Sequence, residues 1–226
     1  MKAATATLAT KRRRSPAPAG GETQSRRDRV IDAALEVLAQ YGARGFTHRE
    51  VDRYLGQPLG STSNYFRRRI DLLSMTGARM MELDLLDVTR ILGTVSPNPT
   101  VTVERVADLL LQLYELWMRP ENHSRALARM EITIERLRNA ELSAATQGLI
   151  AQAEERFQVI FERLGSKSPS RSATHFLRLL VSMNVFILED RATPDRLLLR
   201  TLLRDWLMVS LKAMSDRSGA ARNSRK

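Results

Sequence analysis

The chain has 226 residues, of which 43% are hydrophobic and 27% charged, and this suits one large or two small globular domains. It contains no cysteine, which excludes disulfides, thiolate metal sites and cysteine nucleophiles, and its three histidines are too scattered to indicate a metal site. No apolar run reaches the roughly 18 residues of a membrane-spanning helix, so we expect a cytoplasmic protein.

The net charge of +11 is unevenly distributed along the chain. Residues 1–24 carry +4, residues 25–73 carry +3, the long segment 74–215 carries +1, and residues 216–226 carry +3. An N-terminal module that binds a polyanion, attached to a nearly neutral body, would have this charge distribution. Basic tails that only keep the protein soluble would also produce it.

The two ends of the chain are expected to be disordered and basic. Residues 1–24 are rich in small residues, Pro and Gly, and cannot bury enough apolar surface to fold. Their basic run at 11–14 could contact phosphates as a flexible arm or remain a solvated tail. Residues 216–226 are likewise expected to form a disordered basic tail.

From Ser25 onward, apolar residues recur with the spacing of an amphipathic helix. Ser25 can cap the start of this first helix, and Gly42 marks its end. Thr47 and Glu50 have the spacing of a capping box, which predicts that a second, shorter helix begins at Thr47 and stops at Gly56.

A tight turn at 56–60 leads to a short third helix, expected from Ser61 to about Arg67, and a long helix then extends to about Leu92. After a Pro/Gly-containing break, further helices are expected at 101–118, 122–139, 143–164, 170–190 and 195–214. Because no alternating strand pattern occurs, the sequence predicts an all-α fold of about nine helices.

The segment 47–69, THREVDRYLGQPLGSTSNYFRRR, has the order short helix, glycine-bearing turn, short helix. In a helix-turn-helix motif of this kind, the second helix enters the major groove of DNA. Here that helix carries Ser63, Asn64 and Tyr65, whose hydroxyls and amide suit phosphate oxygens and base edges. Arg49, in the preceding helix, could make two hydrogen bonds to a guanine edge.

This order of elements resembles the TetR family of transcriptional regulators. The family pattern is aromatic-Gly, hydrophobic-Thr, a helix, Gly-Val-Ser, then a helix ending in an aromatic pair with Phe, followed by a basic residue and Leu. The positions that agree with it are Tyr41-Gly42, Phe46-Thr47, Val51, Leu55-Gly56, Gly60, Tyr65-Phe66, Arg69 and Leu72. The match covers about residues 25–75, and Thr62 stands where a hydrophobic residue is usual.

The resemblance implies a helix-turn-helix domain at 25–73, with the motif at about 47–66, and a ligand-sensing and dimerisation domain at 74–215. It implies a bacterial repressor that binds a pseudo-palindromic DNA operator as a homodimer, needs no cofactor, and is released by a small molecule. The DNA-binding residues that it implies are Thr47, His48, Arg49, Gly60, Ser61, Ser63, Asn64, Tyr65 and Arg69.

The last two long helices are expected to form the dimer interface, although ordinary core packing would also explain their apolar faces. The predicted interface residues are Phe176, Leu179, Leu180, Met183, Phe186, Leu198, Leu202 and Trp206. Adaptable side chains in the same domain are predicted to line a cavity for an apolar or aromatic ligand, and each could instead be plain core. They are Tyr114, Trp117, Met118, Met130, Ile134, Phe157 and Phe161, with His175 and Arg178 as polar anchors.

The alternatives to a ligand-released repressor are an enzyme, a DNA-binding protein that senses nothing, and a helical scaffold. No Gly-rich phosphate loop, Ser/His/Asp elbow or metal-ligand spacing is present, so we do not expect an enzyme. A constitutive nucleoid-type DNA-binding protein would keep the motif without a pocket, and a helical scaffold would bind no DNA. An activator is a further alternative, because the position of the operator decides the sign of regulation.

Overall fold

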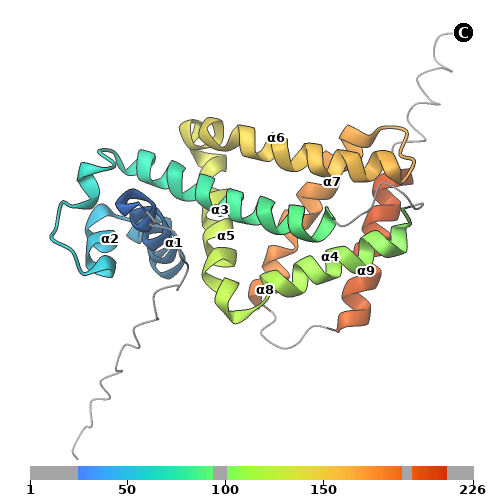
Figure 1. The fold of residues 1–226 in the computed structure, drawn as a ribbon, viewed down its shortest axis with the longest axis horizontal. Helices are drawn as coiled ribbons and strands as arrows, with labels where there is room; N and C mark the ends of the chain where they lie inside the picture. Colours follow the sequence, from blue (N-terminus) through green and yellow to red (C-terminus); the bar gives the residue numbers. More distant parts are fainter. Residues whose placement is uncertain (1–24, 94–100, 190–194, 213–226) are drawn as a thin grey trace, which may run out of the picture.

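The computed structural model describes residues 25–93, 101–189 and 195–212, and these form an all-α fold, as predicted (Figure 1). The helices are α1 (Arg26–Gly45), α2 (His48–Leu55), α3 (Arg69–Leu92), α4 (Val103–Trp117), α5 (His123–Arg138), α6 (Ala140–Arg163), α7 (Pro169–Ser182), α8 (Asn184–Glu189) and α9 (Arg196–Lys212). Two 3₁₀ turns, η1 (Thr62–Asn64) and η2 (Pro120–Asn122), connect α2 to α3 and α4 to α5. No helix within the described ranges is long and apolar enough to cross a bilayer. The predictions for 1–24 and 216–226 lie outside the described residues.

Helix starts follow the capping residues of the sequence. The Ser25 hydroxyl accepts a hydrogen bond from the Asp28 amide at 3.1 Å, and the Thr47 hydroxyl accepts one from the Glu50 amide at 3.2 Å. Only this half of the predicted capping box forms, because the Glu50 carboxylate pairs with Arg53. α6 begins three residues earlier than predicted, since Asn139 caps it at Ala140.

Two further predicted helices differ from the structure. The third helix, expected over 61–67, is only the 3₁₀ turn η1. The helix expected over 170–190 divides at Met183 into α7 and α8. At that division the Asn184 amide donates to the Val181 carbonyl at 2.9 Å, and such a side-chain bond competes with helical backbone pairing.

The buried apolar residues form two clusters, and α3 contributes to both. Figure 1 shows α3 extending from the end of the molecule with α1 and α2 into the remainder, where α6 runs beside it. The cluster around α1 also contains Ala128 and Ile132 of α5 and Leu142 of α6. The N-terminal helices therefore share their core with helices from the second half of the chain.

A kink in the last turns of α1 faces α5. Gly42 has φ 63° and ψ 179°, a backbone conformation that is essentially restricted to glycine. The amide of Ala43, the next residue, donates to the carboxylate of Glu131 on α5 at 2.9 Å. A Cβ atom at position 42 would lie 3.2 Å from the same carboxylate. The kink thus places a backbone donor opposite α5 that a regular helix would use internally.

We expect Gly42→Ala to lower the free energy of unfolding by about 1–3 kcal/mol, since alanine must adopt a disfavoured backbone conformation. The matched control is Gly148→Ala, at an exposed position in α6 where an added Cβ meets nothing within 4 Å. That variant should gain about 0.5–1 kcal/mol, because glycine is unfavourable inside a helix. Urea denaturation of both variants measures the difference, and a neutral Gly42→Ala would contradict the strained kink.

Candidate nucleic-acid interface

The residues predicted to contact DNA come from the start of α2, from η1 and from the residues beside it. Thr47 and Arg49 are exposed at the start of α2. Ser63 and Asn64 of η1 are exposed, and Tyr65, which follows, is 40% exposed. The predicted residues Gly60 and Ser61 lie in the connecting turn, the first exposed and the second half-buried. Since α2 and η1 are in contact, these polar groups lie on neighbouring elements.

His48 differs from its neighbours in α2. Its side chain is half-buried, and its Nε2 atom is covered without a hydrogen-bond partner among the described residues. This atom therefore faces the protein in the free chain, while Thr47 and Arg49 are exposed.

The three consecutive arginines at 67–69 have different environments. The Arg69 guanidinium donates to the carbonyl oxygens of Phe46, at 2.9 Å, and Ala43, and its Cζ lies 5.8 Å from the centroid of the Phe46 ring. The Arg68 guanidinium pairs with Asp71, at the start of its own helix, and with a carboxylate of α6. Arg67 is exposed and forms no ion pair within the described part of the chain. Arg69 thus joins the end of α1 to the start of α3, whereas Arg67 faces solvent.

Asp52, on α2, is a buried carboxylate that the sequence reasoning missed. Its side chain is fully buried and accepts four hydrogen bonds from the turn and η1. Oδ1 accepts from the Thr62 amide at 2.9 Å, the Thr62 hydroxyl at 2.6 Å and the Gln57 amide group at 2.9 Å. Oδ2 accepts from the Gly60 backbone amide at 2.7 Å. The burial of Asp52 could have been predicted only from its position next to Val51, on the buried side of a short helix.

The ionisation of Asp52 follows from these contacts. Burial acts to raise the pKa of its carboxyl group, but the hydrogen bonds from Thr62, Gln57 and the Gly60 amide outweigh burial and lower the pKa below its ordinary value. The group is therefore a carboxylate at neutral pH, and each of its four partners is a donor.

The predicted dimer residues divide between the core and the surface. Phe176, Leu180 and Met183 are buried in the core of this chain, and Leu179 is half-buried. On α9, Leu198 is 57% and Leu202 38% exposed, and Trp206 is half-buried. The side chain of Phe186 lies outside the described residues. Among the members of the set whose side chains are described, only those on α9 thus offer substantial apolar surface.

The residues predicted to line a ligand cavity divide in a similar way. Those in the larger core cluster pack closely: the Phe157 and Phe161 rings lie 5.4 and 5.8 Å from Phe176, centroid to centroid. Tyr114 and Trp117 are buried in that cluster too. Met118 and Met130 are half-buried, and Ile134 is 38% exposed.

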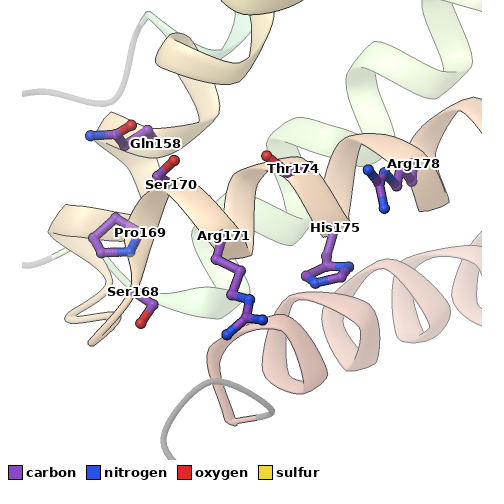
Figure 2. Close-up of a pocket in the computed structure, with 8 residues that line it drawn as sticks. All are labelled: Gln158, Ser168, Pro169, Ser170, Arg171, Thr174, His175 and Arg178. Carbon is purple, nitrogen blue, oxygen red and sulfur yellow. The ribbon is translucent and has the colours of Figure 1, made fainter. Parts of the chain in front are cut away.

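The two predicted polar anchors, His175 and Arg178, line a surface hollow of about 660 Å³ between the end of α6 and α7 (Figure 2). Figure 2 shows Arg171 and His175 extending from the side of α7 on which α9 passes. The other lining residues are Gln158, Ser168, Pro169, Ser170 and Thr174. The hollow thus has cationic and hydroxyl groups in its wall and no carboxylate. It is separate from the aromatic cluster around Phe176, which lies on the buried face of α7.

A buried charge cluster links α3 to α5 and α8. Arg129, on α5, is 5% exposed. Its guanidinium donates to both carboxylate oxygens of Asp84 on α3, at 2.6 and 2.5 Å, and to Oδ1 of Asn184 on α8 at 2.6 Å. It also lies 4.3 Å from the ring centroid of Trp117. Trp117, predicted as a ligand contact, is thus covered by a side chain of its own protein.

The C-terminal part of the chain matches a known family of protein domains. Residues 101–209 match the family model described as the C-terminal domain of tetracyclin repressor-like proteins. A comparison with curated protein sequences finds no match.

Solved structures resemble nearly the whole described chain. A transcriptional regulator from Rhodococcus sp. Rha1 is 13% identical, with a TM-score of 0.69 over 84% of this chain and 97% of that one. A TetR-family member from Streptomyces coelicolor A3 is 21% identical, with a TM-score of 0.64 over 81% and 98%. The multidrug binding protein EbrR, complexed with ethidium, is 20% identical, with a TM-score of 0.62 over 82% and 99%. Residues 101–209 are therefore similar to the C-terminal domain of tetracyclin repressor-like proteins, and the described chain shares the fold of these solved regulators.

Proposed function

We propose that this protein is a sequence-specific repressor that binds a pseudo-palindromic operator as a homodimer and is released by a small molecule. The observation that carries the proposal is the group of exposed polar side chains on α2 and η1, namely Arg49, Ser63, Asn64 and Tyr65. Hydroxyls, amides and a guanidinium of this kind suit base edges and phosphates. The module that presents them, residues 25–73, carries a net charge of +3, which favours a polyanion.

A homodimer is supported by the apolar surface of α9. Leu198, Leu202 and Val209 are 57%, 38% and 58% exposed, and their spacing brings them to one side of the helix. Val181 and Val185, at the end of α7 and the start of α8, add exposed apolar area at 37% and 40%. Exposed apolar side chains that share one side of a helix, as on α9, are typical of a protein–protein interface. Two copies would present two η1 turns to one pseudo-palindromic site.

Release by a small molecule is supported by two observations. The hollow beside His175 is large enough for a small molecule. EbrR, with the same fold, has been solved in complex with ethidium, malachite green and proflavin. The close packing of Phe157, Phe161 and Phe176 supports the second candidate, a regulator that senses nothing. Titration with the anionic aromatic dye 8-anilinonaphthalene-1-sulfonate, which suits the cationic wall of the hollow and does not intercalate into DNA, tests the two: saturable binding that weakens operator affinity would support sensing, and no effect on operator affinity would support the second candidate.

The test of DNA binding is fluorescence anisotropy with DNA from upstream of the gene and a scrambled duplex, at two salt concentrations. If the protein binds the two duplexes equally, a pool of duplexes with random sequence is used to select the site that it binds most tightly. We expect tight, sequence-preferring binding in a 2:1 ratio of chains to duplex. Equal, steeply salt-dependent binding to all duplexes would show only non-specific electrostatic attraction and would contradict the proposal.

Within this assay we expect Tyr65→Ala and Arg49→Ala each to weaken operator binding by about fivefold or more, since one base contact contributes about 1–3 kcal/mol. The matched control is Arg105→Ala, which removes an exposed arginine from α4. This control should bind as the wild type does, and all three variants should keep the wild-type oligomeric state in sedimentation analysis. Wild-type affinity of Tyr65→Ala would show that η1 does not face DNA.

A further inference from the structure

The element that carries Ser63 and Asn64 is too short to hold its own conformation. η1 has only three residues, and 3₁₀ hydrogen-bond geometry is weak. The turn before it is exposed at Pro58, Leu59 and Gly60, so it gains little from burial. Some other interaction must fix this segment against α2.

That interaction is made by the Asp52 carboxylate. It accepts from the Gly60 amide just before η1 and from the Thr62 amide at the first residue of η1, so it fixes the backbone on both sides of Ser61. The Thr62 hydroxyl donates to the carboxylate and lies 3.3 Å from the Gln57 amide nitrogen, which also binds Asp52. Hydrogen bonds to an ionised acceptor are about twice as strong as neutral ones.

The negative charge of Asp52 would be unfavourable on a DNA-binding surface unless it were buried and paired. A carboxylate near a surface that meets phosphates would repel DNA if it were exposed. Asp52 is fully buried, and its four partners are all donors that direct partial positive charge toward it.

We propose that Asp52 is a positioning residue for DNA recognition, which holds the Gly60–Thr62 backbone so that Ser63, Asn64 and Tyr65 are presented in a fixed geometry. This inference rests on the proposed function. It predicts that disturbing the carboxylate weakens discrimination between operator and other DNA without removing any group that contacts DNA.

The two oxygens of Asp52 have different partners, which permits a site-resolved test. In Asp52→Asn, the retained oxygen can keep the three Oδ1 bonds, but the new NH₂ group then faces the Gly60 amide, and two donors cannot pair. We expect hydrogen exchange of the Gly60 amide, followed by NMR, to become roughly tenfold faster or more. Exchange at Thr62 should change less.

Operator binding is measured in parallel. Asp52→Asn should lose about tenfold in affinity for the selected operator, or about 1.4 kcal/mol, and retain its affinity for a scrambled duplex. Thr62→Val removes the hydroxyl and should show a similar loss, whereas Thr62→Ser keeps the hydroxyl and should restore wild-type binding. General destabilisation is monitored by the thermal midpoint, which should stay close to that of the wild type.

Two failures can be told apart because amide exchange needs no DNA. A wild-type protein that prefers no duplex would contradict the proposed function. Wild-type exchange at Gly60 in Asp52→Asn, or equal loss of operator and scrambled binding in that variant, would overturn the role of Asp52. A Thr62→Ser variant as weak as Thr62→Val would overturn it as well, because the hydroxyl would then be irrelevant.

Discussion

Asp84→Ala is expected to lower the free energy of unfolding by about 3–5 kcal/mol, which is the cost of leaving a buried charge without its partner. Asp84 accepts two hydrogen bonds from Arg129, and the side chains of these residues are only 16% and 6% exposed. In the variant the Arg129 guanidinium would keep Asn184 as a hydrogen-bond acceptor, but it would lose the carboxylate that balances its charge. Urea denaturation at one fixed protein concentration measures the change, because dimerisation would make stability depend on concentration.

The control is the double variant Asp84→Leu/Arg129→Met, which removes these two charges and keeps apolar volume. Arg125, which also lies 3.4 Å from Asp84, retains its ion pair with Asp87 in this variant. Replacement of a buried ion pair by apolar residues is often neutral, so most of the lost stability should return. A single Asp84→Ala variant within 1 kcal/mol of the wild type would mean that water reaches Arg129 and that the ion pair is not effectively buried.

Phe176→Ala should lower the free energy of unfolding by about 3–5 kcal/mol, the range for removing a buried phenylalanine. Phe176 is fully buried, and its ring contacts those of Phe157 and Phe161 in tilted and edge-on arrangements. Such aromatic pairs contribute beyond the burial of area. The loss should appear in the same denaturation experiment as a lower midpoint at unchanged slope.

Val159→Ala, on the outer side of α6, is the control for this core variant. Val159 is 45% exposed, so its truncation should change stability by about 0.5 kcal/mol or less. If Phe176→Ala were equally mild, the core around α7 would have to relax into the vacated space, and the close packing of the three rings could not be the stable state.

Features that depend on neighbours in sequence were predictable. The caps at Ser25 and Thr47 formed as predicted because each hydroxyl accepts from an amide three residues ahead. The extents of most helices could be predicted too, since a 3.6-residue period is a local property of the sequence. The failure at 61–67 has a tertiary cause: the amides of Gly60 and Thr62 bind a carboxylate eight and ten residues earlier in the chain.

Interactions between distant segments could not be inferred from periodicity. The carbonyl partners of Arg69 lie 23 and 26 residues away, and their position depends on the kink at Gly42. Periodicity also identifies apolar faces without showing which element covers them. On α9, Leu199 and Leu203 are buried while Leu198 and Leu202 are exposed, and all four are leucines.

The shared core of the N-terminal helices limits how this protein can be recombined. Ile132 of α5 and Leu142 of α6 are fully buried among side chains of α1 and α3, and Gly77 of α3 lies where an added Cβ would come within 3.3 Å of Ile132. A chimera that exchanged only residues 25–73 would therefore join unmatched apolar surfaces. To transfer the DNA specificity of this protein to another regulator, α5 and the start of α6 would have to be exchanged together with the N-terminal helices. The segments that must be exchanged as a unit are therefore not continuous in the sequence.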